Sequence, residues 1–197
     1  MKFVLACLLG AIASFLWGFV SWMHLGWHEA GIHSFRDEKA VAEVIKVNAT
    51  HGRGIYRLPG LQNVPSFATT EQKAKAKQQH AAAMEEGPFV YSIIRPGRSE
   101  SDMIGNMLFS FGRSLLACIF IAGLLRHTIL TYPGRIAFTA AAGVFAGLVT
   151  DAQMWIWFEF PDRELLVNLA DHFFEWLLVG AVVGLFVGKA PTANDVR

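Results

Sequence analysis

The stretch from residue 3 to residue 23, FVLACLLGAIASFLWGFVSWM, decides the fold class of this chain. It carries no charged side chain, and its length is about that of a helix that crosses the roughly 30 Å hydrocarbon core of a bilayer. Trp22 and Trp27 stand where aromatic side chains anchor a span at the membrane interface. We therefore predict a first membrane span here, because a signal peptide has a shorter apolar core.

Further apolar runs of similar length lie in the second half of the chain, at residues 103–125, 136–157 and 165–187. The composition agrees, because 17% of the residues are charged, against roughly 25% in a soluble domain. Short connections join the last three runs and favour antiparallel neighbours. The sequence thus predicts a mainly α membrane protein, with four transmembrane helices in a bundle and the lipid bilayer as its first partner.

The orientation of the chain follows from its short-loop positive charges. When the spans alternate in direction, one side of the membrane receives Lys2, Arg126, Arg135, Lys189 and Arg197. Positive loops stay in the cytoplasm, so we expect both termini to be cytoplasmic and the protein to lie in a cell inner membrane. The predicted parts are helix 1 at 1–24, an extracytoplasmic domain at 25–102, the other helices at 103–189 and a tail at 190–197.

The predicted extracytoplasmic domain has helix and strand signals. Asp37 offers a cap for a helix that runs to Ile45, and Thr69 with Gln72 forms a capping-box pattern before a second helix that ends near Glu86. Two runs bounded by Pro and Gly are typical of strands, at residues 54–59 and 89–94. We therefore predict a small αβ insertion between helices 1 and 2. Its apolar content is low, so we expect it to rest on the membrane bundle.

Polar residues of the spans recur at steps of three and four, which places them on one face of each helix. The first span carries Ser14, Trp17, Ser21, His24 and His28. The second carries Asp102, Asn106, Ser110 and Arg113. The fourth carries Asn168, Asp171 and Glu175, with His172 at the edge, and the third carries Asp151.

Counting residues outward from the turns places these charges at similar depths. Asp151 comes level with Asp171, and Arg113 lies within about one helical turn of that level. A charge near the bilayer centre costs at least about 2.5–3.5 kcal/mol, so we expect Arg113, Asp151, Asp171 and Glu175 to face inward and meet.

Three acids against one arginine require compensation by a protonated carboxyl, a protonated His172, a bound cation or water. Two interpretations therefore stay open. The cluster holds the helices in register, or it forms an ion or proton site with Asn106 and Asn168 as further ligands.

A divalent metal is a weaker hypothesis. His24 and His28 are four residues apart and could present two imidazoles to one ion. The sequence pattern supplies no third ligand beside them, and the cofactor stays unknown.

Glycines repeat every fourth residue on two spans, at Gly143 and Gly147 and at Gly180, Gly184 and Gly188. Such faces allow close approach of helix backbones. We expect Gly143 and Gly147 to look into the bundle and make room for Glu175. The face of the fourth span is expected to pack on the first helix, and the alternative is a protein partner or a homo-oligomer.

The sequence lacks the residue patterns that several classes of function require. Lys and Arg are dispersed, so no nucleic-acid surface is predicted. Cys7 and Cys118 lie inside apolar runs and are expected to be buried thiols rather than a disulfide framework. We find no nucleotide loop, nucleophile elbow or Cys-x-x-Cys pair, and this favours a non-enzymatic protein.

Three functions remain. The first is an accessory or scaffolding membrane protein that binds a partner or a small ligand. The second is a small cation- or proton-coupled transport element. The third is a metal-handling protein that uses His24, His28 and a bundle carboxylate.

Overall fold

The computed structural model describes residues 1–60, 64–99 and 102–188, so the predicted tail at 190–197 lies outside the described residues. The chain divides into two compact units. The helical unit comprises Met1–His33 and Asp102–Arg197, and the insertion unit comprises Ser34–Ser101. The loop after the first helix, up to His33, is grouped with the helices. The predicted extracytoplasmic domain at 25–102 stays a prediction.

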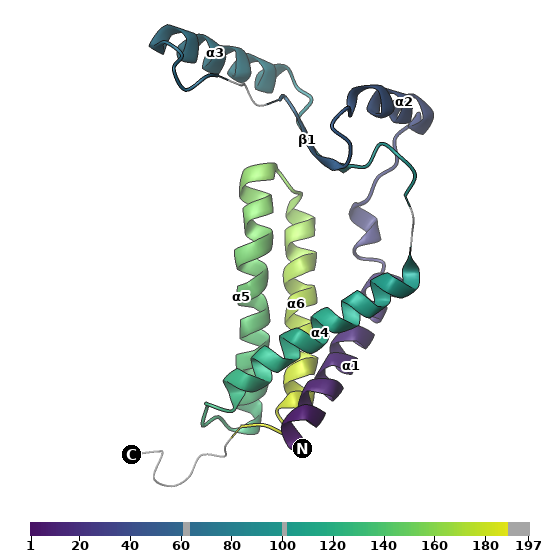
Figure 1. Cartoon of the computed structure of the whole chain (residues 1–197). Helices are drawn as coiled ribbons and strands as arrows, with labels where there is room; N and C mark the ends of the chain where they lie inside the picture. The colour runs from purple at the N-terminus through teal and green to yellow at the C-terminus, as the bar shows by residue number, and fades with distance from the viewer. Residues whose placement is uncertain (61–63, 100–101, 189–197) are drawn as a thin grey trace. The chain divides into compact units, whose positions relative to one another are not determined.

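The helical unit contains α1 (Lys2–Met23), the short 3-10 helix η1 (Glu29–Gly31), α4 (Met103–Leu125), α5 (Tyr132–Phe158) and α6 (Asp162–Val183). Within the described residues, α1, α4, α5 and α6 are long and apolar enough to cross a membrane (Figure 1). The prediction of a mainly helical chain with four candidate spans is therefore confirmed.

The start of α5 differs from the prediction by four residues. The Thr131 hydroxyl accepts a hydrogen bond from the Gly134 backbone N–H at 3.3 Å, and Pro133 lies in the first turn. Proline is tolerated there because N–H groups of the first turn have no partner within the helix. The helix therefore begins at Tyr132, although Pro and Gly resemble a loop at the sequence level.

The end of α6 also differs, since the helix stops at Val183 and not at residue 187. Gly184 is its C-cap, and the Arg135 guanidinium donates a hydrogen bond to the Gly184 carbonyl at 2.9 Å. Glycine is a poor helix former, and Gly188 has a φ of +100°, a left-handed conformation that glycine adopts readily.

The helices of this unit form an open row. α6 packs against α5 on one side and against α1 on the other, while α4 packs on α1 and meets α6 only weakly. Figure 1 shows α5 and α6 side by side, with α4 inclined along α1. Among the described residues, α4 and α5 are therefore the two ends of the row in the order α5, α6, α1, α4.

The apolar core lies where α1, α4 and α6 meet. Cys7 and Cys118 are buried free thiols of this core, with the Cys7 Sγ 3.9 Å from the Cys118 carbonyl oxygen. Gly10 lies beside them, and a Cβ at this position would come within 2.6 Å of the Val183 Cγ2 atom. The absent side chain of Gly10 therefore sets how closely α1 approaches α6.

The glycine face of α6 packs on α5, so the predicted contact with α1 is wrong, and an interface with a protein partner or a second copy stays a prediction. A Cβ at Gly180 would lie 2.9 Å from the Thr139 Cβ, and both Gly180 and Gly184 are buried. The polar face of α6 turns the other way, toward α1 and α4. One helix thus uses opposite faces for two different neighbours.

The glycines of α5 face the same interface, and they also differ from the prediction. Gly143 makes room for the Trp176 side chain and Gly147 for the His172 ring. Glu175 is not their neighbour, because it lies on the α1 side of α6. The sequence pattern therefore marks the α5–α6 contact but not the side chains that fill it.

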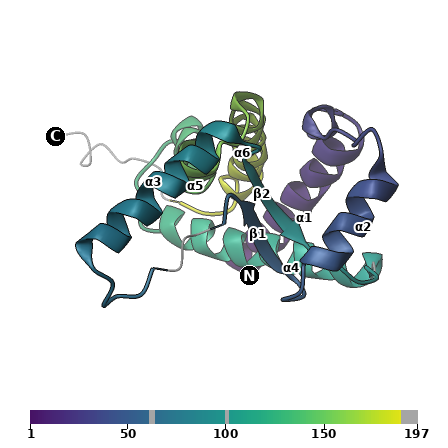
Figure 2. The same ribbon diagram turned by 90° about the horizontal axis from the view of Figure 1, so that it is seen from above.

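The insertion unit contains α2 (Glu38–Asn48), β1 (Gly54–Leu58), α3 (Thr70–Glu86) and β2 (Val90–Ile94). The strands pair in antiparallel fashion, with Gly54 opposite Ile94 and Leu58 opposite Val90, and Figure 2 shows them side by side. The predicted helices and strands are all present at the expected places.

Local capping explains why the helices of the insertion unit begin where they do. The Asp37 carboxylate accepts from the Ala40 N–H at 2.9 Å. Thr69 and Gln72 form the reciprocal capping box, with distances of 2.9 and 3.2 Å. These contacts need only neighbouring residues, and so the sequence predicts them well.

The core of the insertion unit is slight. Among the described residues of this unit, Ala49 is the one buried apolar side chain, at 5% exposed. Phe67 and Ile93, in contrast, are 89% and 79% exposed. A two-stranded sheet is marginal without further packing. The expectation that this unit rests on the helices stays a prediction.

Candidate functional site

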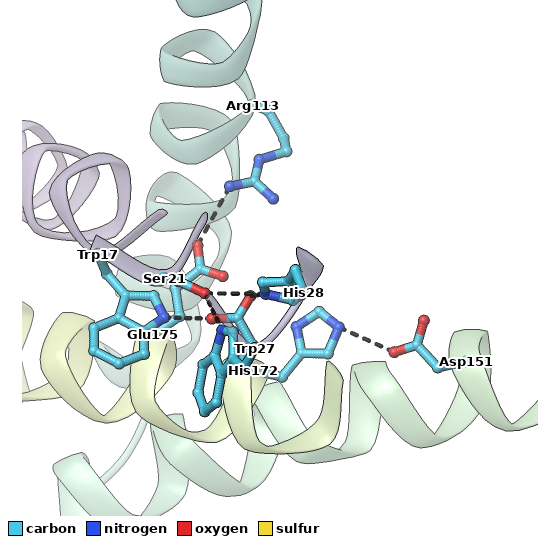
Figure 3. Close-up of polar contacts among 9 residues, drawn as sticks. Trp17, Ser21, Trp27, His28, Arg113, Asp151, His172 and Glu175 are labelled. Atoms are coloured by element: carbon cyan, nitrogen blue, oxygen red, sulfur yellow. Dashed lines mark hydrogen bonds and ion pairs between the residues drawn. The ribbon is translucent and has the colours of Figure 1, made fainter. Parts of the chain in front are cut away.

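Polar side chains make three groups of contacts along α6. The first group is centred on Glu175. This carboxylate is 7% exposed. Its Oε1 atom accepts from the Ser14 hydroxyl at 2.5 Å. The same atom lies 3.4 Å from the Arg113 Nη2 (Figure 3). The Ser114 hydroxyl is 2.8 Å from the Ser14 hydroxyl and 3.3 Å from Arg113 Nη2. Hydrogen bonds thus join α1, α4 and α6 at one level.

The second contact surrounds Asp171, one turn along α6. The Trp17 indole donates to Asp171 Oδ1 at 2.6 Å, and His28 Nε2 lies 3.5 Å from Oδ2. Both neighbours of the carboxylate come from the N-terminal segment, Trp17 from α1 and His28 from the loop that follows it. Asp171 therefore ties that loop back to α6.

His28 is 4% exposed, and its surroundings hold it in one orientation. Its ring stacks on Trp22 with a centroid distance of 4.0 Å and an interplanar angle of 4°. Its Nε2 atom is 3.0 Å from the Ser21 hydroxyl, which also accepts from the Trp27 indole at 2.9 Å. When its Nε2 carries no proton, His28 can accept a hydrogen bond from the Ser21 hydroxyl, and when Nε2 carries a proton it can donate to Asp171.

A third pair joins α5 and α6. His172 Nε2 lies 3.2 Å from Asp151 Oδ2, with side chains 30% and 22% exposed (Figure 3). Asp151 Oδ2 and His172 Nδ1 are buried without a hydrogen-bond partner in the part of the chain that the structure describes. The two groups are thus close together without a directed hydrogen bond.

The predicted residues come together as pairs and not as one cluster. Arg113 meets Glu175, Asp171 meets the N-terminal segment, and Asp151 meets His172. The reason is the open row, because α4 and α5 lie at its two ends with α6 and α1 between them. Residue counting nevertheless predicted the depth of Asp151 correctly, because Asp151 lies beside His172, the residue that follows Asp171 on α6.

The two asparagines take no part in these contacts. Asn106 is exposed and Asn168 is half-buried, and neither side chain bonds to another of the described residues. Asp102, from the same predicted stripe as Asn106, caps α4 by accepting from the Gly105 N–H at 2.9 Å. The α4 stripe therefore reaches the site through Arg113.

The two histidines of the metal hypothesis differ in their surroundings. His24 is exposed, and its ring lies edge-on to Phe19 at 5.2 Å. The α1 helix ends at Met23, and Gly26 has a φ of +62°, so helical spacing no longer relates His24 to His28. No group of three His, Cys, Asp or Glu side chains that could hold a metal ion occurs within residues 1–60, 64–99 and 102–188.

Arg113 is unlike the other charged groups of the site, because its side chain is 66% exposed. It lies at about the midpoint of the 23-residue helix α4. Its Nη2 atom makes the contacts with Ser114 and Glu175. Nε and Nη1 have no hydrogen-bond acceptor among the described residues, so most of the guanidinium lacks a partner in this part of the chain.

The site includes side chains that sequence reasoning did not single out as functional, namely Ser14, Trp17, Ser21, Trp27 and Ser114. The α1 members had a signal, since they follow the spacing of three and four that places them on one face. Ser114 had none, because its contact with Ser14 joins segments far apart in the sequence. Trp27 was expected only as an interfacial anchor, and its hydrogen bond to Ser21 depends on how the chain turns after α1 ends.

The site has limited chemistry as a catalyst. A serine beside a carboxylate can act as a nucleophile with a base. Ser14 is 1% exposed and lies inside the α1–α6 interface, so a substrate has no path to its hydroxyl in this packing. The imidazole–carboxylate pairs can exchange protons, and Arg113 can bind an acceptor.

Comparison of the chain with protein-family models, with curated proteins and with solved structures found no match. Its function is therefore argued from its own residues.

Proposed function

We propose that this chain is a non-enzymatic accessory subunit of an inner-membrane complex, with both termini in the cytoplasm. Its α4 helix holds a transmembrane segment of a partner protein. The observation that carries the proposal is Arg113, whose side chain is 66% exposed halfway along an apolar helix.

An exposed arginine at this depth requires a partner. Arg or Lys at the centre of a span costs about 2.5–3.5 kcal/mol even on the mildest scale, and residues near helix ends avoid this cost by reaching the interface. Arg113 lies too far from either end of α4 to do so. A neighbouring span that presents a carboxylate would supply the acceptors that Nε and Nη1 lack, and planar bidentate pairing suits arginine.

The rest of the helical unit supports a scaffolding role. Ser14, Ser114 and Glu175 tie three helices together around Arg113. This network holds the guanidinium in place before a partner arrives, which lowers the entropy cost of binding. The open end of the row leaves α4 free for another helix.

The experiment is native mass spectrometry of the full chain extracted gently from its own membrane. We expect a stoichiometric partner subunit with the unaltered chain, loss of that subunit with Arg113→Leu, and its retention with Arg113→Lys. A photoreactive residue at Leu116, one turn from Arg113 and exposed, should crosslink to a partner span that contains Asp or Glu.

The matched control is Arg163→Leu, since Arg163 is exposed in the first turn of α6. Thermal unfolding of each variant separates lost binding from lost folding. A partner retained by a folded Arg113→Leu variant would overturn the proposal. A homodimer mass would also overturn it, because the second chain would then be another copy and not a partner.

A second candidate function is a small cation- or proton-coupled transport element. Two carboxylate–imidazole pairs favour it, Asp171 with His28 and Asp151 with His172. In proteoliposomes, Asp171→Asn or Glu175→Gln should abolish flux while the protein still inserts and folds. Normal flux in either variant, or absence of flux in the unaltered protein, would exclude this candidate.

A further inference from the structure

A second polar region lies at the opposite end of the helical unit from the loop that carries His28. A cavity of about 680 Å³ opens where α1 begins, α4 ends and the chain leaves α6. Its lining includes Lys2, Phe3, Arg126, His127, Phe186 and Val187. None of these residues belongs to the Arg113, Asp171 or Asp151 contacts described above.

Within residues 1–60, 64–99 and 102–188, no acidic side chain neutralises the basic side chains of this cavity. Neither Lys2 nor Arg126 forms an ion pair with an acid of the described segments, and no Asp or Glu is part of the lining. Arg135, close by, is different because it donates to the carbonyls of Leu130 and Gly184 at 3.0 and 2.9 Å. Arg126 thus keeps its donors available, whereas Arg135 uses them to fasten helix ends.

Arg126 is nevertheless held in place. Its guanidinium carbon lies 5.2 Å from the centroid of the Phe3 ring, a distance at which a cation is attracted to an aromatic face. This contact joins the end of α4 to the start of α1 and directs positive charge to the cavity. His127 follows directly and adds a third nitrogen-bearing side chain.

The cavity also has apolar walls, from Phe3, Phe186 and Val187. Cations beside apolar surface suit a ligand with a phosphate on one side and hydrocarbon on the other. If α1 and α4 span the bilayer, their ends lie at its interface, the level of lipid headgroups, and basic pockets between helices there bind anionic lipids. Positive-inside orientation places this end in the cytoplasmic leaflet.

We propose that the Lys2–Arg126 cavity binds the phosphate headgroup of an anionic phospholipid. The inference rests on membrane insertion but not on the partner that Arg113 is proposed to hold. Its failure is distinguishable from failure of that proposal, because the two sites share no residue and their tests use different variants.

The experiment is lipid titration of the purified full chain, with native mass spectrometry to count bound lipids. Phosphatidylglycerol should bind at least tenfold more tightly than phosphatidylcholine, with one lipid retained at low concentration. Each lost charge near a headgroup weakens binding about fivefold, so a Lys2→Gln, Arg126→Gln double variant should bind about thirtyfold more weakly.

Two controls make the result specific. Arg163→Gln removes an exposed positive charge at the start of α6, away from the cavity, and should leave the affinity unchanged. Arg126→Lys keeps the charge and should retain most of the binding. Unfolding temperatures of all variants confirm that the helices remain packed.

Three results would contradict the proposed lipid site. Equal affinity for the two lipids, or unchanged affinity in the double variant, would contradict the site. Inorganic phosphate that binds as tightly as phosphatidylglycerol would show that a free anion, and not a lipid, is the ligand.

Discussion

The helical unit and the insertion unit both expose large apolar side chains, but the exposure has different meanings. On α4, Leu108, Phe109 and Phe120 are 68%, 82% and 68% exposed and belong to an apolar helix with a single charged side chain. In the insertion unit, Phe67 and Ile93 are as exposed, yet about half of the chain's charged residues surround them in sequence. The first kind of surface suits contact with lipid, whereas exposed apolar side chains among charged ones are typical of a surface that packs against another protein segment.

Polar groups show the reverse pattern. In the helical unit they face one another across helices, as Ser14 and Glu175 do in the interior. In the insertion unit the Lys46–Glu43 pair is 57% and 59% exposed at the protein surface. Buried polar contacts contribute more to stability than exposed ones, so this comparison predicts where substitutions will have large effects.

The largest effect is expected at the α5–α6 contact. Gly180→Ala places a Cβ 2.9 Å from the Thr139 Cβ and 3.1 Å from the Ile136 Cα, which is backbone and cannot move aside easily. We expect a loss of about 3 kcal/mol in the free energy of unfolding, measured by denaturation in detergent. The control is Gly112→Ala, where nothing lies within 4 Å of the new Cβ. Equal stability of the two variants would mean that α5 and α6 do not pack this closely.

The next effect is expected from Glu175→Ala. It leaves the Ser14 hydroxyl without its carboxylate and Arg113 without its anion, and it should cost about 2 kcal/mol of unfolding free energy. Glu175→Gln keeps an acceptor oxygen and should cost less. If both variants are as stable as the unaltered protein, the hydrogen-bond network does not join the three helices.

A smaller and local effect is expected from Thr69→Ala, which removes one half of the capping box of α3. The loss should be about 1 kcal/mol. Hydrogen exchange measured by mass spectrometry should be faster for the backbone amides of α3, and the exchange rates in α1 and α6 should not change. Faster exchange in the helical unit as well would show that the two units unfold together.

The smallest effect is expected from Lys46→Ala, because an exposed i,i+3 ion pair contributes less than about 0.5 kcal/mol. Hydrogen exchange of α2 should be nearly unchanged at moderate salt. A loss above 1 kcal/mol in α2 would indicate that Lys46 packs against another part of the protein.

Some features of the site could be predicted from the sequence only in part. The spacing of Ser14, Trp17 and Ser21 places them on one face of α1, and the structure turns that face toward α6. His24 shares the spacing but not the position, because α1 ends before it. Periodicity holds only while the helix continues, and the end of a helix is less well predicted than its interior.

By itself, the sequence determined the candidate spans, the capped helices and the two strands of the insertion, because each depends on contacts within one segment or one turn. Only the tertiary structure decided that the Gly180 face meets α5, that His28 returns to Asp171, and that Arg113 pairs with Glu175 while remaining exposed. These outcomes depend on which helix lies beside which. The order of the row follows from the fit of whole surfaces, and local periodicity carries no information about it.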